Sequence, residues 1–168
     1  MADVVVRMGE AAVSGTPGDV LSCIGLGSCI GLALVDRGRG VAALAHVMLP
    51  AATRPDAPRP HKFADLAVPA LLDAVLAHGA LRLRLEAFLA GGAAMFQLGA
   101  GQDIGARNEA AVRARLAELR IPVRAAATGG GSGRTVRVHV GADIGITVRE
   151  AGGLEEDLLG VPAGKVAA

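Results

Sequence analysis

Cys29 and His46 are the two residues whose types and spacing favour nucleophilic chemistry. Cys29 follows the glycine-rich turn 25–28 and opens an apolar segment, so the turn is expected to present its thiol. A lone cysteine is more often a small core residue. His46 shifts the balance, because the residues around it from 41 to 49 are almost wholly apolar and a buried imidazole needs a polar partner. Together the two residues predict a thiol nucleophile with an imidazole as its acid–base partner.

A predicted hairpin would bring these two residues together. Segments 30–35 and 41–48 are apolar and flank a polar turn at 36–40, so they are expected to pair as antiparallel strands. In that register Ile30 faces His46, and Cys29 lies about one residue away. A slip of one residue is compatible with the pattern. The alternative interpretation is a core histidine bonded to a backbone carbonyl.

Backbone amides beside Cys29 are expected to complete the site. The glycines leave the N–H groups around Gly27 and Ser28 uncommitted, and such donors hold the oxyanion that forms when a thiolate adds to a carbonyl. His46 would take the thiol proton, give it to the leaving group and then activate water. This chemistry requires no metal and no organic cofactor.

Other motifs point to weaker alternatives. The two cysteines and four histidines lack zinc-type pair spacing, so no metal site is predicted. Segment 128–135 is similar to a phosphate loop, but Thr128 and Arg134 replace the required glycine and lysine and a strand pattern follows. A dinucleotide-binding loop at 25–31 is rejected because its third glycine comes one residue late and no helix follows.

Composition limits the class of protein. The 168 residues suit one domain, and the hydrophobic content of 52% argues against disorder. A net charge of +1 and an aromatic content of 2% give no reason to expect nucleic acid or membrane partners. No apolar run is long enough to span a membrane, and the first residues do not resemble a signal peptide. We therefore expect a soluble cytoplasmic protein with reduced thiols.

Periodicity predicts an α+β domain, mostly strands with two main helices packed on a sheet. One helix is expected from Phe63 to about Gly79, with Pro69 inside it, and a second after an N-cap at Asn108. An alternative role for Arg107 and Asn108 is substrate contact near the site. The domain spans 1–168, and from about 150 to 168 a loose tail is expected. Strands are expected at 3–8, 20–24, 30–35, 41–48, 83–90, 123–127, 135–140 and 144–148.

Several spaced motifs also resemble the CheD family of chemoreceptor glutamine deamidases. The principal pair is Gly25-Leu26-Gly27-Ser28-Cys29-Ile30 and Ala45-His46-Val47-Met48-Leu49-Pro50. Further blocks match in the same order: Gly9-Glu10, Gly91-Gly92-Ala93-Ala94-Met95-Phe96, Ile104-Gly105-Ala106-Arg107-Asn108 and Thr128-Gly129-Gly130. The resemblance covers about residues 5–148.

The resemblance implies an α/β/β layered sandwich that deamidates glutamine side chains on the cytoplasmic part of methyl-accepting chemotaxis receptors. It assigns the nucleophile to Cys29 and the base to His46. It also implies methylesterase side activity in some members, and binding of a CheC-type chemotaxis phosphatase in some.

One position departs from the family pattern. Family members commonly carry threonine six residues before the nucleophile, as a third catalytic member, and this chain has Cys23 there. A thiol is a poorer hydrogen-bond acceptor than a hydroxyl. Either the Cys23 carbonyl or Ser22 orients His46, or the orientation is weaker. The rival interpretations are a catalytically weak chemotaxis adaptor, which docks on a receptor or phosphatase, and a cysteine peptidase.

Overall fold

The computed structural model describes residues 1–95 and 103–160. The strands are β1 (Asp3–Val5), β2 (Ala11–Ser14), β3 (Val20–Leu26), β4 (Ile30–Asp36), β5 (Val41–Val47), β6 (Glu86–Gly91), β7 (Val123–Thr128), β8 (Arg134–His139), β9 (Gly145–Glu150) and β10 (Glu155–Asp157). The helices are α1 (Ala64–Ala77) and α2 (Ile104–Glu118), with short 3₁₀ turns at Pro60–Lys62, Arg82–Arg84 and Leu158–Gly160.

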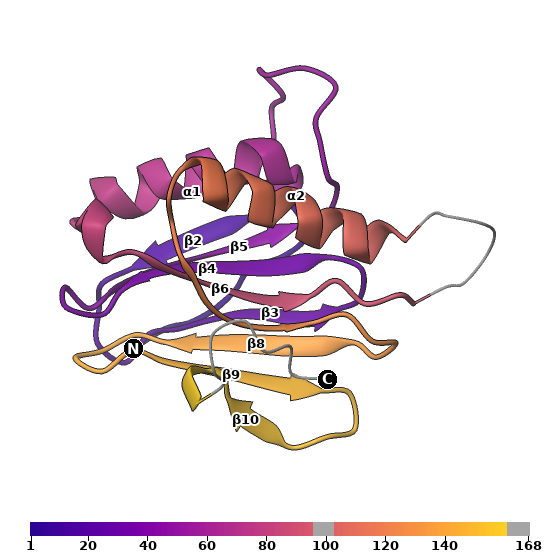
Figure 1. The fold of residues 1–168 in the computed structure, drawn as a ribbon. Coiled ribbons are helices and arrows are strands. Elements are labelled where there is room, and N and C mark those ends of the chain that lie inside the picture. Colours follow the sequence, from indigo (N-terminus) through magenta and orange to yellow (C-terminus); the bar gives the residue numbers. More distant parts are fainter. Residues whose placement is uncertain (96–102, 161–168) are drawn as a thin grey trace.

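Two sheets and a pair of helices form three layers (Figure 1). One sheet has the order β2-β5-β4-β6-β7, and α1 and α2 cover its outer face. The other has the order β1-β3-β8-β9-β10 and packs against the opposite face. The predicted α+β fold with an α/β/β sandwich and two main helices is confirmed.

Strands β4 and β5 are buried on both of their faces. Their side chains alternate between two hydrophobic cores, one under the helices and one between the sheets. Leu32 and Leu34 belong to the core under the helices, whereas Ala33 and Val35 belong to the core between the sheets. This burial explains the continuous apolar sequence of both strands.

The helices differ in detail from the sequence prediction. Helix α2 begins at Ile104, and its N-cap is Asp103, whose side chain accepts a hydrogen bond from the Ala106 amide at 3.0 Å. Asn108 is therefore not the N-cap that we predicted; it lies inside the helix and is fully buried. The sequence misleads here because asparagine caps helices well, whereas only packing can place it on a buried face.

Pro69 is accommodated inside α1 by a contact from the neighbouring helix. Proline has no N–H, so the carbonyl four residues earlier, that of Asp65, loses its helical donor. The Nε atom of Arg115 in α2 donates to that carbonyl at 3.1 Å. The contact between α1 and α2 thus compensates for the proline.

The β4–β5 hairpin pairs one residue out of the predicted register. Asp36 pairs with Val41, so His46 faces Gly31 and Val47 faces Ile30. The buried carboxylate of Asp36 accepts from the Arg39 amide at 3.1 Å and from the Leu81 amide at 2.8 Å. These bonds place Asp36 in the strand instead of in the turn, which shifts the pairing by one.

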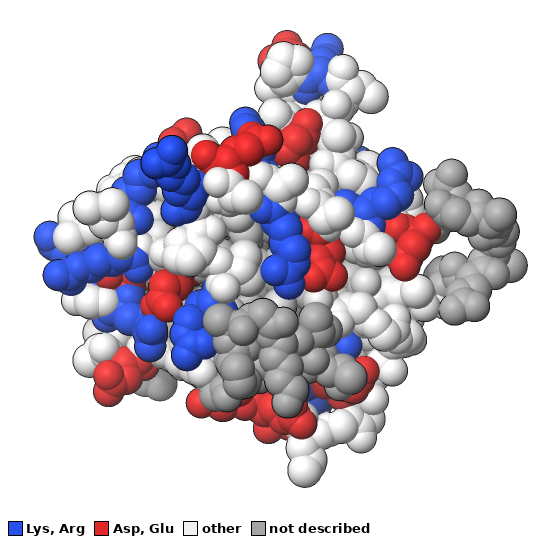
Figure 2. Space-filling model, in the orientation of Figure 1, with Lys and Arg blue, Asp and Glu red and all other residues white. Residues whose placement is uncertain are grey.

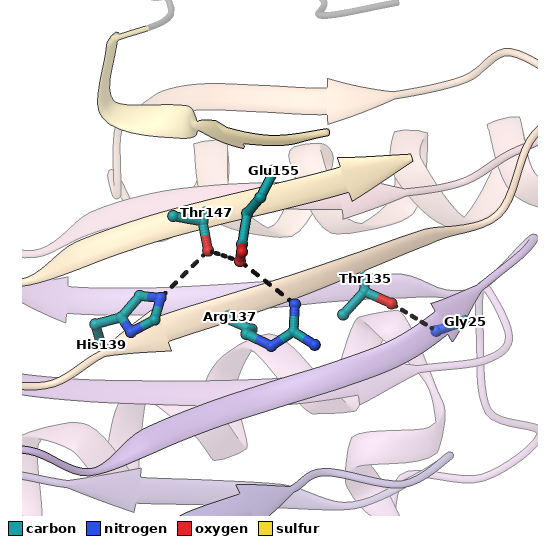
Figure 3. A network of polar contacts seen from close by, with 6 residues as sticks. All are labelled: Gly25, Thr135, Arg137, His139, Thr147 and Glu155. Atoms are coloured by element: carbon teal, nitrogen blue, oxygen red, sulfur yellow. Dashed lines mark hydrogen bonds and ion pairs between the residues drawn. The ribbon is translucent and has the colours of Figure 1, made fainter. Parts of the chain in front are cut away.

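Residues 155–160 form a strand and a 3₁₀ turn, in contrast to the loose tail that we predicted from about residue 150. Strand β10 pairs with β9, and Leu158 is 2% exposed. Figure 3 shows a polar network that fastens β10: Glu155 accepts from Thr147 at 2.5 Å and from Arg137 at 3.3 Å, and His139 contacts Thr147 at 3.2 Å. The last part of the predicted tail, 161–168, lies outside the described residues.

The surface carries both signs of charge side by side. Figure 2 shows lysine and arginine interspersed with aspartate and glutamate on the face seen in Figure 1. This mixture agrees with the net charge of +1. Among the helices of the described residues, none is sufficiently long and apolar to cross a membrane.

Candidate functional site

The chain gathers its sequence motifs at one end of the sandwich. Strands β1, β3, β5, β6 and β7 finish at this end, and β2, β4 and β8 begin there, as their parallel and antiparallel pairings require. The segments that meet here are 6–10, 27–29, 48–50, 92–95 and 129–133, on the right in Figure 1. Sequence motifs as far apart as Gly9-Glu10 and Thr128-Gly129-Gly130 therefore line one edge. Phe96, the last residue of one such motif, lies outside the described residues.

Cys29 and His46 occupy neighbouring positions at this end. His46 on β5 faces Gly31 on β4, and Cys29 lies two residues before Gly31. The Cys29 side chain packs against the core between the sheets, and His46 lies on the same face of β5 as Leu44, which belongs to that core, so both side chains point into the layer between the sheets. Residues in this diagonal relation are roughly 7–8 Å apart, within reach of long side chains. Within the described residues no hydrogen bond joins the thiol to the ring.

Gly31 allows the two sheets to approach closely at this point. A Cβ atom on Gly31 would lie 2.9 Å from Val136 Cγ1, 3.0 Å from Leu26 Cδ1 and 3.7 Å from Cys23 Cβ. A larger residue would therefore push the sheets apart. The absent side chain also leaves His46 without a bulky cross-strand neighbour.

The ring of His46 is oriented by a backbone carbonyl of the N-terminal segment. Its Nδ1 atom lies 3.0 Å from the carbonyl oxygen of Val6, and the residue as a whole is 5% exposed. Since a carbonyl only accepts, Nδ1 carries the proton and Nε2 of the neutral ring is left as the base. The Val6 amide donates to the Ser22 carbonyl at 2.7 Å, so β3 holds this segment in place.

Burial sets the resting charges of both groups. It raises the pKa of the Cys29 thiol above its ordinary value of about 9, so the thiol rests protonated. Burial lowers the pKa of His46 below 6.5, against smaller raising effects from the Val6 hydrogen bond and the charge of Glu10. The resting pair is thus a neutral thiol and a neutral imidazole.

Cys23, the expected third member, lies in the core between the sheets with a different partner. It is fully buried, and its Sγ is 4.0 Å from the carbonyl of Ala45 on β5. Burial raises the pKa of this thiol far above its ordinary range. His46 Nδ1 donates its hydrogen bond to the Val6 carbonyl, not to Cys23 or Ser22. Val6 carries no signal in the sequence, because its contact uses the backbone.

The turn that holds Cys29 is fixed from the side of β6. Gly92 donates to the Cys29 carbonyl at 2.8 Å, and Ala93 donates to the Gly27 carbonyl at 2.9 Å. Gly91 has a φ of +104°, and a Cβ there would collide with the Cys29 carbonyl oxygen. Within the described residues, the amides of Gly27, Ser28 and Cys29 have no backbone acceptor.

Asn108 approaches the same turn from helix α2. Its Nδ2 donates to the Ser28 carbonyl and to the Met48 carbonyl, each at 2.9 Å. A signal for its burial existed in the sequence: Asn108 lies four residues before Val112 and eight before Leu116, on one helix face. Its neighbour Arg107 is exposed.

Among the described residues, the titratable side chains do not gather into a metal centre. In residues 1–95 and 103–160 there is no group of three His, Cys, Asp or Glu side chains placed to hold a metal ion. The groups at the Cys29 end include one thiol, one imidazole and backbone amides. That set suits attack on a carbonyl followed by proton transfer.

Comparison with known proteins agrees with the motifs. Residues 48–149 match the family model described as "CheD chemotactic sensory transduction". The probable chemoreceptor glutamine deamidase CheD of Methanococcus vannielii is 40% identical over 146 residues, which cover 86% of this chain and 93% of that protein. The counterpart in Symbiobacterium thermophilum is 45% identical over 141 residues, covering 80% and 85%.

A third relative covers still more of the chain. The chemoreceptor glutamine deamidase CheD of Thermotoga maritima is 41% identical over 153 residues, covering 90% of this chain and 94% of that protein. The chain therefore belongs to the CheD family.

Proposed function

We propose that this protein hydrolyses particular glutamine side chains of methyl-accepting chemotaxis receptors to glutamate, with Cys29 as nucleophile and His46 as acid and base. The observation that carries the proposal is the diagonal placement of Cys29 and His46 in one layer, with the Nδ1 atom of His46 fixed by Val6. The relatives named chemoreceptor glutamine deamidases support the substrate. Because the receptor segment concerned is cytoplasmic, the proposed place of action is the cytoplasm.

The proposed reaction begins with proton transfer from the Cys29 thiol to Nε2 of His46. The sulfur forms a bond to the glutamine side-chain carbonyl carbon, and the amides around Gly27 and Ser28 stabilise the oxyanion. The C–N bond then breaks as the imidazolium gives its proton to the departing ammonia, which leaves a thioester. Water attacks the thioester while Nε2 accepts a proton, and the C–S bond breaks to release glutamate and restore the thiol.

The Val6 carbonyl takes the orienting role in this proposal. It holds the proton on Nδ1 throughout, so Nε2 alone exchanges protons with substrate and thiol. It also stabilises the imidazolium, because a carbonyl accepts more strongly from a charged donor. Cys23 contributes packing beneath the site, which explains why a thiol is compatible with the reaction.

The direct test is mass spectrometry of a cytoplasmic receptor fragment incubated with the protein. Deamidation adds about one dalton at each modified glutamine and releases one ammonia, whereas a peptidase would produce fragments. An unchanged receptor mass with wild-type protein, across receptors that carry glutamine at methylation positions, would contradict the proposal. The same assay with a glutamyl methyl ester measures methylesterase side activity, since the same thioester would form with loss of methanol.

A non-catalytic adaptor is the second candidate, favoured by the thiol at Cys23 in place of threonine. In that case the chain would bind a receptor or a CheC-type phosphatase without turnover. Competition between the two partners is expected in either case, if both use the Cys29 end. Turnover decides between the candidates, because an adaptor releases no ammonia.

Cys23→Ala is expected to lower stability without removing activity. The change empties a small volume in a fully buried place and costs about 1–2 kcal/mol of unfolding free energy. The rate of ammonia release should stay within about threefold of wild type, since the sulfur contacts Ala45 and not the ring. Urea unfolding and an ammonia assay measure the two effects. If Cys23→Ala lost as much activity as Cys29→Ala, Cys23 would have to be counted as a catalytic residue.

The pH dependence of the reaction should show a low acid limb. His46 acts as a base only when neutral, and burial lowers its pKa, so the neutral form persists below the ordinary value of 6.5. The plot of kcat/KM against pH should therefore have its acid midpoint below 6.5. In parallel, alkylation of Cys29 should still be rising at pH 9, because burial raises the thiol pKa. An acid midpoint above 6.5 would be inconsistent with this environment for the ring.

A further inference from the structure

We propose that Asn108 is a positioning residue that holds the Cys29 turn in register with His46. Its side-chain amide bonds the carbonyl just before the nucleophile and a carbonyl two residues after the base. This inference rests on the proposed function, since it assigns Asn108 a part in that reaction.

The ladder between β4 and β5 ends before it can fix Cys29. Its last pair is Ile30 with Val47, and beyond it the Met48 amide turns away to donate to the Lys62 carbonyl at 2.9 Å. Cys29 thus lies just outside the paired region while His46 lies inside it. Here, where β4 and β5 no longer pair through their backbones, the Nδ2 atom of Asn108 links the backbone segment before β4 to the segment after β5.

The geometry requires two donors at one atom. Nδ2 has two hydrogens, and one points to the Ser28 carbonyl and one to the Met48 carbonyl, each at 2.9 Å. A hydroxyl has one hydrogen, and a carboxylate has none. Among uncharged side chains of this length, only the amide of asparagine serves both carbonyls at once.

The Oδ1 atom of Asn108 shows that a contribution to stability does not by itself explain an asparagine at this position. Asn108 is fully buried, and its Oδ1 atom has no hydrogen-bond partner in the described part of the chain. A buried carbonyl oxygen without a donor costs stability. An asparagine with one satisfied and one orphaned end, placed on the apolar face of α2, is explained by what its amide holds in place.

The test compares Asn108→Asp with wild type, using a cytoplasmic receptor fragment as substrate and iodoacetamide as a probe of Cys29. Aspartate has the same shape but, when ionised, repels both carbonyls. We expect kcat to fall by about tenfold to a hundredfold, as small misplacements of a nucleophile do, with KM changed less than about twofold. Iodoacetamide labelling of Cys29 at neutral pH should slow several-fold. Labelling is located by fragment mass, because Cys23 lies in the same tryptic peptide.

A pH series separates positioning from packing. A protonated aspartate donates one hydrogen bond, so the ratio of variant to wild-type kcat should rise as the pH falls. The same ratio for Asn108→Ala, which cannot titrate, should stay flat. If Asn108→Asp does not fold, Asn108→Ala is judged by the same criteria for kcat, KM and labelling.

Val112→Ala is the matched control. Val112 is fully buried on the same face of α2, one turn from Asn108, and it belongs to the core under the helices. Val112→Ala removes packing but keeps the two hydrogen bonds of Asn108. Its kcat should therefore remain near wild type even if it loses as much unfolding free energy as the Asn108 variants. The inference is overturned if the Asn108 variants keep kcat within about twofold, or lose no more than Val112→Ala. Absence of ammonia release by wild type would instead reject the proposed function, and the iodoacetamide rates would still judge the bridge.

Discussion

Cys29→Ala is expected to abolish deamidation of a receptor fragment while the fold stays intact. The methyl group of alanine cannot form the thioester, so no covalent route to the product remains. Removing a nucleophile that works with a partner base lowers kcat by about a millionfold in well-studied hydrolases, and we expect a loss of at least about ten-thousandfold. Because Cys29 is only partly buried, the unfolding free energy should change by no more than about 1 kcal/mol.

The control for this experiment is the same substitution at the other thiol. Cys23→Ala removes the same atom six residues earlier in the chain and should leave turnover nearly intact. Ammonia release and a mass increase of about one dalton per glutamine are both measured, so that slow hydrolysis by water is recognised. If Cys29→Ala turns over at an undiminished rate, the thiol is not the nucleophile.

His46→Asn is expected to lower kcat by about a thousandfold to ten-thousandfold. The amide nitrogen of asparagine can reach the Val6 carbonyl as Nδ1 of histidine does, so the local structure is preserved while the base is removed. Since burial keeps the Cys29 thiol protonated, the loss of a proton acceptor should affect every later step. Labelling of Cys29 by iodoacetamide at neutral pH should slow as well, because the thiolate no longer forms at the ring.

His139→Asn is a suitable matched control. Its ring lies on the outer sheet, where it contacts Thr147 in the network of Figure 3, away from the end that holds Cys29. The variant should keep wild-type kcat and wild-type labelling. Equal losses in both variants would mean that the effect comes from general destabilisation, and retention of activity in His46→Asn would exclude the ring as the base.

Several parts of the fold and site followed from local pattern. Apolar runs around a polar turn gave the β4–β5 hairpin, and apolar spacing gave the two helices within a few residues. The short strand β2 was missed, because its four residues include two alanines and a serine and carry little strand preference. The register was missed by one residue because Asp36, a turn-type residue, is retained in the strand by the Leu81 amide, 45 residues away.

The amino-acid sequence by itself determined the chemistry on offer and its order along the chain: one thiol after a glycine turn, one imidazole in an apolar strand, and the motifs of the CheD family around them. Only the tertiary structure decided what each group touches. Val6 reaches His46 through its backbone, and Asn108 bridges two carbonyls from a helix 60 and 80 residues away. Main-chain atoms are the same at every position, so contacts made through them leave no trace in residue type and appear only when distant segments meet.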